Sequence, residues 1–296
     1  MSEHHTSAHV ISGHAGSRLN RAFMLGIGLN VAYVILEVIY GLYYDSMGLL
    51  SDAGHNLSDV ASMIIALIAY KAARRAPTER YTYGFTRATV DASIINALIL
   101  YAAVALILYE SINKLFHPVA TDGIVIAWVA GAGVIINGLT TWLFIYGSKT
   151  DLNIRGVFLH MLADTLVSVG VVVSGVVVHF TGWYIIDPLM GIGIAVMIAV
   201  GSYSQLRDSM RLSLDGVPRG IDVEQVRRTI LSVPGVRSLH HLHIWALSTT
   251  LTAMTVHVVI TDPAEIDRVI RQIRERVVPL GIGHSTIEAE TNDEDE

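Results

Sequence analysis

Residues 51–59 read SDAGHNLSD and place two aspartates, a histidine and an asparagine within an otherwise apolar run over residues 47–70. A run of that length can cross a bilayer as a helix, which takes about 20 predominantly apolar residues. A charged side chain near the bilayer centre costs about 2.5–3.5 kcal/mol on insertion scales, and ionisable residues inside spans are usually functional. The stretch therefore predicts a membrane-spanning helix that carries a functional site.

The composition of the whole chain also indicates a membrane protein. Of the 296 residues, 52% are hydrophobic and 16% are charged, and the mean hydropathy is +0.51. Soluble domains average about 25% charged residues. The chain has no cysteine, so a metal site must use nitrogen and oxygen donors. The net charge of −6 gives no sign of a nucleic-acid partner, and the partner expected from composition is a lipid bilayer.

Six segments are predicted to span the membrane, namely residues 22–44, 47–70, 90–113, 123–146, 153–180 and 185–206. The basic residues near their ends are one-sided, eleven against one. The eleven are Arg18, Arg21, Lys71, Arg74, Arg75, Arg80, Arg87, Lys149, Arg155, Arg207 and Arg211, and the other side has Lys114. Because Lys and Arg are enriched in cytoplasmic loops, both termini are predicted to be cytoplasmic. The short loops and the lack of a signal peptide favour the cell inner (plasma) membrane.

The composition divides the chain into four parts. They are a flexible tail over residues 1–17 with His4, His5, His9 and His14, a six-span transmembrane domain over 18–208, a cytoplasmic domain over 209–290 and an acidic tail over 291–296. The histidines of the first part could bind metal weakly or could be solvated filler.

The cytoplasmic part has the pattern helix, strand, strand, helix, strand. Asp222 can cap a helix to about residue 233, and residues 264–278 have helical periodicity. Residues 237–247 and 251–260 alternate as strands, and 286–290 form a short third strand. This αββαβ order predicts a small open sheet with helices on one face. The fold class is thus an all-α six-helix transmembrane domain plus a cytoplasmic α+β domain.

Two HxxxD pairs in different spans form the candidate site. His55 and Asp59 are four residues apart, and so are His160 and Asp164, so each pair lies on one helix face. The second and fifth spans run in opposite directions, and each aspartate lies roughly 18 Å from its own membrane face at 1.5 Å per residue. The pairs can therefore meet near mid-membrane, and two imidazoles with two carboxylates form a tetrahedral donor set suited to zinc.

Plainer interpretations apply to single residues. One histidine on an apolar helix is often hydrogen-bonded to a neighbour, and one aspartate can cap a helix, pair, or line a water cavity. Two such pairs favour a metal site, because ionisable groups in lipid are rare. Asp52 is open between an outer access path and a polar helix start. Asn96 and Asn137 are predicted to form interhelical hydrogen bonds.

Together with HMLAD at 160–164, the motifs RYTYG at 80–84, DGVP at 215–218 and LHIWAL at 242–247 carry a family resemblance. On these motifs and SDAGHNLSD, the chain resembles the cation diffusion facilitator family, most closely its zinc-exporting branch, from about residue 18 to 290. The resemblance implies a homodimeric exporter with six spans per protomer and a cytoplasmic ferredoxin-like domain. Such proteins exchange divalent metal for protons by alternating access. The resemblance assigns the transport site to His55, Asp59, His160 and Asp164, with His55 favouring zinc over cadmium.

The resemblance also implies zinc in the cytoplasmic domain. By position in the motif, the ligands across the dimer interface are His240, His257, His284 and Glu290, with His243 and Glu288 as possible additional ligands. The alternative is that some are ordinary surface residues of strands. His241 is predicted to point to the sheet face opposite His240, because strand side chains alternate. A further family site in the loop after the second span is predicted to be missing, because that loop has Glu79 and no histidine.

The expected mechanism is competition between metal and protons for one set of ligands, since ligands must be deprotonated to bind metal. Histidine, which titrates near pH 6.5, is suited to such a switch. Two other classes remain open. An intramembrane zinc hydrolase would need an open zinc position and a base, and HExxH is absent. A passive cation channel would carry flux that is independent of a proton gradient.

Overall fold

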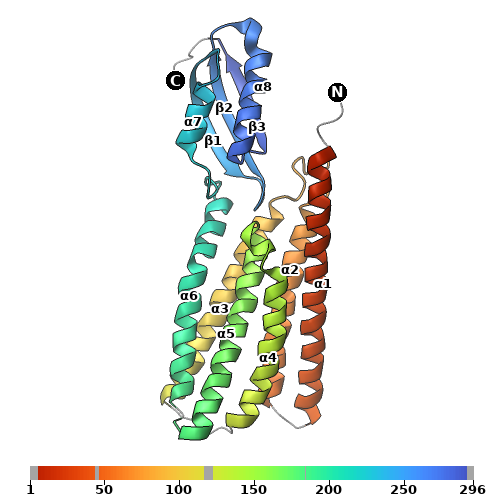
Figure 1. Ribbon diagram of the computed structural model, residues 1–296, viewed down its shortest axis with the longest axis vertical. Coiled ribbons are helices and arrows are strands. Elements are labelled where there is room, and N and C mark those ends of the chain that lie inside the picture. The colour runs from red at the N-terminus through yellow and green to blue at the C-terminus, as the bar shows by residue number, and fades with distance from the viewer. Residues whose placement is uncertain (1–5, 44–46, 117–122, 184, 292–296) are drawn as a thin grey trace. The chain divides into compact units, whose positions relative to one another are not determined.

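The computed structural model describes residues 6–43, 47–116, 123–183 and 185–291 (Figure 1). The chain forms two compact units, each described here by itself. The first comprises Met1–Ala72 and Ala92–Leu206, and the second Ala73–Asp91 and Arg207–Glu296.

Six long helices build the first unit. They are α1 (Thr6–Tyr43), α2 (Met47–Ala72), α3 (Ala88–Phe116), α4 (Gly123–Phe144), α5 (Leu152–Thr181) and α6 (Ile186–Ser213). The first residues of α3 and the last residues of α6 belong to the second unit. Within the described residues, four stretches are long and apolar enough to cross a membrane, namely Leu19–Leu36, Ala88–Phe116, Leu152–Thr181 and Pro188–Ser213. A shorter apolar stretch, Ala130–Phe144, lies in α4. This is a helical membrane domain, and the number of six spans stays a prediction.

The helix α1 begins earlier than the sequence indicated. Residues 6–17, predicted as part of a flexible tail, are helical and continuous with the apolar part of α1. No proline interrupts residues 6–43. Extending an existing helix by a residue costs far less than nucleating a new one, so the helix propagates through this polar segment.

Apolar packing between helices fixes the position of the candidate site. The rings of Phe23 of α1 and Phe144 of α4 meet edge to face with centroids 4.9 Å apart, and Met63 of α2 and Met161 of α5 are buried in the same cluster. Gly26 allows this approach, because a Cβ there would meet Thr140, Met63 and Phe144 at 3.1–3.3 Å. The cluster therefore holds α2 close to α5, the two helices that carry the HxxxD pairs.

The second unit has the element order predicted from sequence. It runs α7 (Val223–Leu231), β1 (Val236–Ala246), β2 (Thr252–Ile260), α8 (Ile266–Val277) and β3 (His284–Glu290). The sheet order is β1-β2-β3, with β1 and β2 antiparallel and β2 and β3 parallel. Asp222 caps α7 by accepting hydrogen bonds from the backbone of Glu224 and Gln225.

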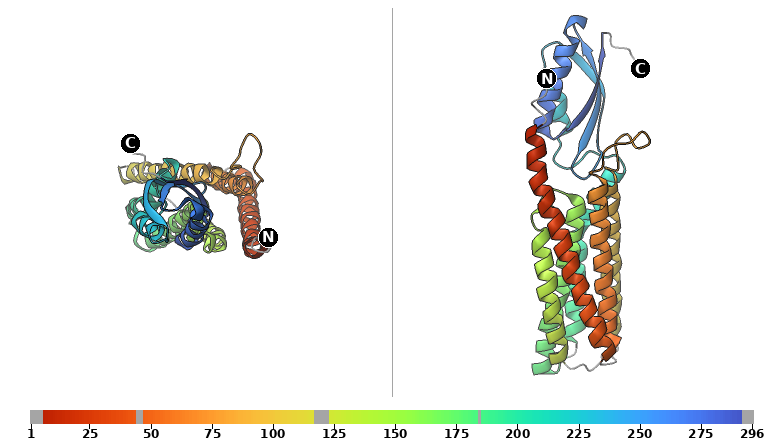
Figure 2. Two further views of the ribbon diagram at one scale, coloured as in Figure 1. Left: turned by 90° about the horizontal axis from the view of Figure 1, so that it is seen from above. Right: turned by 90° about the vertical axis from the view of Figure 1, so that its right-hand side faces the viewer.

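Both helices of this unit cover one face of the sheet, as the sequence predicted (Figure 2, right). Val226 of α7 and Ile273 of α8 pack against Ile244, Met254 and Val256 of the strands, and all five are buried. The other face of the sheet is left for polar side chains of β1, β2 and β3.

The segment after α2 belongs to the C-terminal unit, and the sequence did not predict this. Residues 73–91, which follow α2, belong with the C-terminal unit and not with the helices on either side. The Arg87 guanidinium donates to Asp215 Oδ1 at 2.9 Å and to the Ser213 carbonyl at 2.7 Å, and the Thr249 backbone N–H donates to Thr89 Oγ1 at 3.2 Å. The chain therefore passes between the units three times, after residues 72, 91 and 206, whereas the sequence predicted one boundary at residue 208, because contacts over such separations leave no local pattern.

Candidate metal centres

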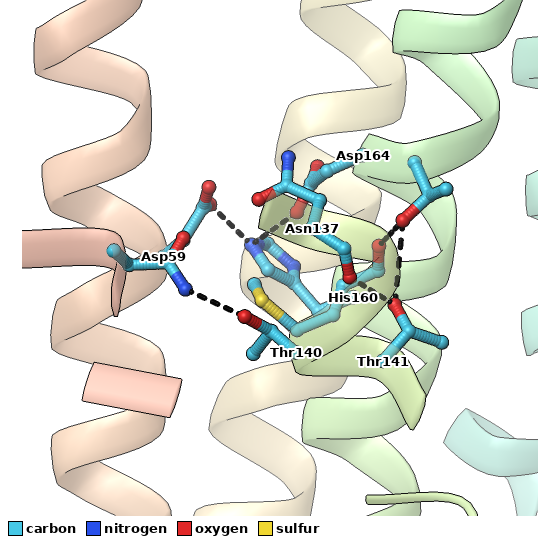
Figure 3. A network of polar contacts seen from close by, with 9 residues as sticks. Asp59, Asn137, Thr140, Thr141, His160 and Asp164 are labelled. Carbon is cyan, nitrogen blue, oxygen red and sulfur yellow. Dashed lines mark hydrogen bonds and ion pairs between the residues drawn. The ribbon is translucent and has the colours of Figure 1, made fainter. Parts of the chain in front are cut away.

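The first centre lies between α2 and α5. Asp59 projects from α2 toward His160 and Asp164 of α5 (Figure 3). His160 Nε2 lies 2.8 Å from Asp59 Oδ1 and 3.8 Å from Asp164 Oδ2. The structure thus brings together three of the four residues that the HxxxD pairs supply.

Burial and spacing fit a metal ion at this place. The side chains of Asp59, His160 and Asp164 are 0%, 2% and 7% exposed. One potential ligand atom from each lies within 4.8 Å of the other two. Bonds of about 2.0–2.2 Å to a tetrahedral zinc place its ligand atoms about 3.3 Å apart, between the two distances observed here. A small shift of side chains would suffice to accommodate the ion.

The helix α4 supplies a polar wall beside these three residues (Figure 3). The Asn30 amide of α1 donates to Thr140 Oγ1 at 3.1 Å, and Thr141 Oγ1 lies 3.3 Å from Thr165 Oγ1 of α5. Asn137 is 3% exposed and its side-chain oxygen has no hydrogen-bond partner in the described structure. The interhelical hydrogen bond predicted for Asn137 is therefore not formed through that oxygen. Asn137 precedes Thr141 by one turn, which was the available sequence signal for a polar face toward α5.

Two predicted residues cannot be placed by their side chains. His55 and Asp52 lie in α2, but their side chains are outside the described part of the structure. The same holds for the side chains of His9 and His14, and residues 1–5 with His4 and His5 lie outside it altogether. His55 as the fourth ligand stays a prediction.

A second centre lies on the uncovered face of the C-terminal sheet. His257 Nδ1 is 2.7 Å from Glu290 Oε1, and His240 Nε2 is 3.3 Å from Glu290 Oε2. Potential ligand atoms of these three residues lie within 4.8 Å of one another. All three are partly exposed, at 20–32%. His240 pairs with His257 across β1 and β2, and β3 brings Glu290 alongside.

Two other predicted ligands of this domain, Glu288 and His284, lie in different places. Glu288 Oε2 lies 3.5 Å from His257 Nε2, the ring nitrogen opposite the one that faces Glu290, and is not one of the three grouped ligands. His284 is not one of them either, because it begins β3 opposite Ala253 and its ring contacts Tyr83 at a centroid distance of 5.9 Å. Six residues along a strand separate His284 from Glu290 by about 20 Å. Within one protomer, His284 is thus remote from the residues it was grouped with.

The prediction for His241 is wrong. A β-bulge lies between His240 and His243, and the ring of His241 lies 5.1 Å from those of both His240 and His257. The rule of alternation fails where an extra residue is inserted into a strand. The signal was in LHHLHI at 239–244, where the apolar residues that face the core are spaced by three and then by two.

That the loop after α2 lacks a metal site stays a prediction. Within the residues that the structure describes, only two groups of three or more His, Asp or Glu ligand atoms lie within 4.8 Å of one another, and neither includes Glu79. Thr78, Glu79, Arg80, Tyr81 and Phe85 instead line an open surface hollow.

Comparison with known proteins also divides the chain into a transmembrane and a cytoplasmic domain. Residues 23–212 match the family model for the cation efflux transmembrane domain, and residues 218–290 match that for the cation efflux protein cytoplasmic domain. The chain is 34% identical to a "Cadmium, cobalt and zinc/H(+)-K(+) antiporter" of Bacillus velezensis over 94% of its own length and 90% of the relative's. It is 34% identical to zinc transporter ZitB of Escherichia coli over 98% and 92%. It is 35% identical to the metal cation efflux system protein CzcD of Cupriavidus metallidurans over 81% and 76%.

Proposed function

The chain belongs to the cation diffusion facilitator family and is a multi-pass membrane transporter of metal cations, not an enzyme, and from this premise we propose that it exports Zn²⁺ in exchange for protons. Export proceeds by alternating access, with the ion bound between α2 and α5. Both termini are cytoplasmic, six helices span the inner (plasma) membrane, and the transporter works as a homodimer.

The observation that carries this proposal is the buried contact of Asp59 with His160, one turn from Asp164. Three ionisable side chains almost removed from solvent are costly unless they bind an ion or protons. A bound Zn²⁺ would offset the negative charge of both carboxylates and take a lone pair of the imidazole. Protons can satisfy the same atoms when the metal leaves, so one site holds either metal or protons.

The choice of zinc rests on the donors and on the relatives. Two imidazoles and two carboxylates, with His55 as the fourth ligand, suit four-coordinate zinc. The chain has no cysteine, so softer thiolate coordination does not compete. The Escherichia coli relative is named as a zinc transporter, and the name of the Bacillus velezensis relative also includes cadmium and cobalt. We expect zinc to be the main substrate.

The centre on the C-terminal sheet has a different role in this proposal. His240, His257 and Glu290 are partly exposed and can take up zinc from the cytoplasm. The domain of ferredoxin-like fold would join two protomers, and zinc bound there would favour the dimer arrangement competent for transport. Cytoplasmic zinc would then regulate its own export.

The test is zinc uptake into proteoliposomes under an imposed pH gradient, with internal zinc and pH dyes read together. Wild type should move zinc and protons in opposite directions. Asp164→Asn should abolish both fluxes, because it removes a buried ligand charge. Asp91→Asn, which changes an exposed aspartate in the first turn of α3, is the matched control and should retain both.

Two results would contradict the proposal. Zinc flux without proton movement would indicate a passive channel. Normal exchange by Asp164→Asn would place the transport site elsewhere.

A further inference from the structure

We propose that His241 is a metal ligand of the C-terminal sheet, where it completes a four-donor zinc site with His240, His257 and Glu290. The inference rests on the proposed binding of metal by this domain, and it changes the character of the site. Three protein donors leave a zinc position open to water, whereas four close it.

The β-bulge brings the extra imidazole to this face. His240 and His243 each pair with a residue of β2, and between these pairs two residues of β1, His241 and Leu242, lie opposite the single residue Val256. Leu242 packs against the hydrophobic core with Val256. The inserted residue is therefore His241, and it stays on the face that carries His240.

The spacing of the three rings is that of imidazoles around one tetrahedral ion. A Zn–N bond of about 2.05 Å puts a ring centre about 3.2 Å from the metal, so two coordinated rings have centroids about 5.2 Å apart. The observed centroid distances are 5.2 Å for His240 and His257, 5.1 Å for His240 and His241, and 5.1 Å for His241 and His257. His241 is exposed. It does not belong to the group of ligand atoms that lie within 4.8 Å of one another, so binding would require one of its nitrogens to be directed toward the other three ligands.

The backbone adopts a costly conformation at this residue. His241 has φ of +48°, in the left-handed region. That region costs a residue with a side chain roughly 1–2 kcal/mol, and glycine avoids the cost. Strain of this kind collects at functional sites. Histidine at this position is accounted for if its imidazole binds an ion.

A zinc site with four protein ligands is better suited to sensing zinc than to passing zinc to the transport site. Four protein ligands hold zinc without an open position from which it could be passed on. With His241 as a ligand, the C-terminal domain would retain its ion while the transport site turns over. It would thus report the cytoplasmic zinc level and would not feed the transport site.

The experiment measures metal binding to the full-length protein in detergent, in an Asp164→Asn background that removes the transport site. Co²⁺ serves as a spectroscopic probe, because tetrahedral Co²⁺ absorbs far more strongly in the visible range than five- or six-coordinate Co²⁺. Zinc affinity is measured by competition with a chelator. The variants are His241→Ala and His241→Gly, and the matched control is His179→Ala, which changes an exposed histidine in the last turn of α5.

We expect His241→Ala and His241→Gly to weaken the visible absorption and to lower zinc affinity at least about tenfold, since even indirect loss of support for a ligand costs 10–100-fold. His179→Ala should change zinc affinity less than twofold. His241→Gly relieves the backbone strain, so the thermal midpoint of the metal-free protein should not fall below that of wild type. Weaker binding by a protein that is no less stable separates loss of a ligand from misfolding.

Unchanged spectra and affinity in both His241 variants would overturn the inference while leaving the three-donor site intact. The proposed cytoplasmic site itself is tested by His257→Ala. If this variant also binds cobalt and zinc as before, the domain does not hold metal at this centre, and the failure lies in the proposed function.

Discussion

His160 Nε2 of α5 lies 2.8 Å from Asp59 Oδ1 of α2, and both side chains are almost fully buried. This contact joins two helices that are separated by α3 and α4 in the chain. A buried polar contact of this kind, whether a hydrogen bond or an ion pair, contributes little to stability by itself, because desolvation opposes the attraction. Its arrangement is better explained by an ion that takes the place of the contact.

Zinc should stabilise the protein through Asp59. In a His257→Ala background, which removes the second centre, zinc at 100 times its Kd should add about 2.7 kcal/mol to the stability of the folded state. Asp59→Asn keeps an oxygen that can accept from His160 but loses the charge, so it should fold and show no such gain. Thermal unfolding in detergent with and without zinc measures this difference. An equal rise in Tm for both proteins would remove Asp59 from the site.

Zinc binding should weaken as the pH falls. Each ligand binds either a proton or the metal. Each ligand proton that the metal displaces should lower the apparent affinity by up to about tenfold for each unit by which the pH falls. Calorimetry on the His257→Ala protein at pH 5.5 and 7.5, in two buffers of different ionisation enthalpy, measures both affinity and proton release. Affinity that is constant over this range, with no proton released, would be inconsistent with exchange at a shared site.

Local periodicity explains what the sequence could predict. The four-residue spacing of His160 and Asp164 defines a helix face directly, and the polar interruption in the second apolar run marks α2. Alternation located the strands to within two residues at each boundary that the structure describes. The order of helices and strands in the C-terminal domain followed from the same patterns.

The features that the sequence did not predict depend on how the strands pair and not on local periodicity. The place of His241 follows from one inserted residue, which breaks the period of two at a point that only the spacing of Leu239, Leu242 and Ile244 reveals. The separation of His284 from Glu290 follows from the register of β3 against β2. Register between strands that are distant in the chain is set by packing and not by local pattern.

Helix packing beside the proposed transport site should depend on Gly26. A Cβ at this position would lie 3.1 Å from Thr140 and 3.3 Å from Met63 and Phe144, so Gly26→Ala forces α1 away from its neighbours. We expect a loss of about 1–3 kcal/mol. Gly28, in the same helix, has no atom within 4 Å of its ideal Cβ, so Gly28→Ala is the matched control and should be neutral or slightly stabilising. Thermal unfolding in detergent compares the two, and equal midpoints would show that α1 does not pack closely here.

Two arginines of the second unit should differ in their contribution to stability. Arg219 Nε lies 2.6 Å from Asp208 Oδ1, and the Asp208 side chain is 5% exposed, whereas Asp215, the partner of Arg87, is 58% exposed. Removing one partner of a buried charge leaves the other uncompensated, but an exposed charge remains solvated. Because Arg219 is itself about half exposed, water offsets part of this loss. We expect Arg219→Ala to cost about 1–3 kcal/mol and Arg87→Ala at most about 1 kcal/mol.

The readout is the thermal midpoint of each variant, with Asp208→Asn as a further variant that removes the buried charge. Arg219→Ala combined with Asp208→Asn should recover part of the midpoint lost by Arg219→Ala alone, because the uncompensated carboxylate is then absent. Purely additive losses would mean that the two side chains do not interact in the protein. A larger loss for Arg87→Ala than for Arg219→Ala would mean that burial of Asp208 does not govern the strength of these pairs.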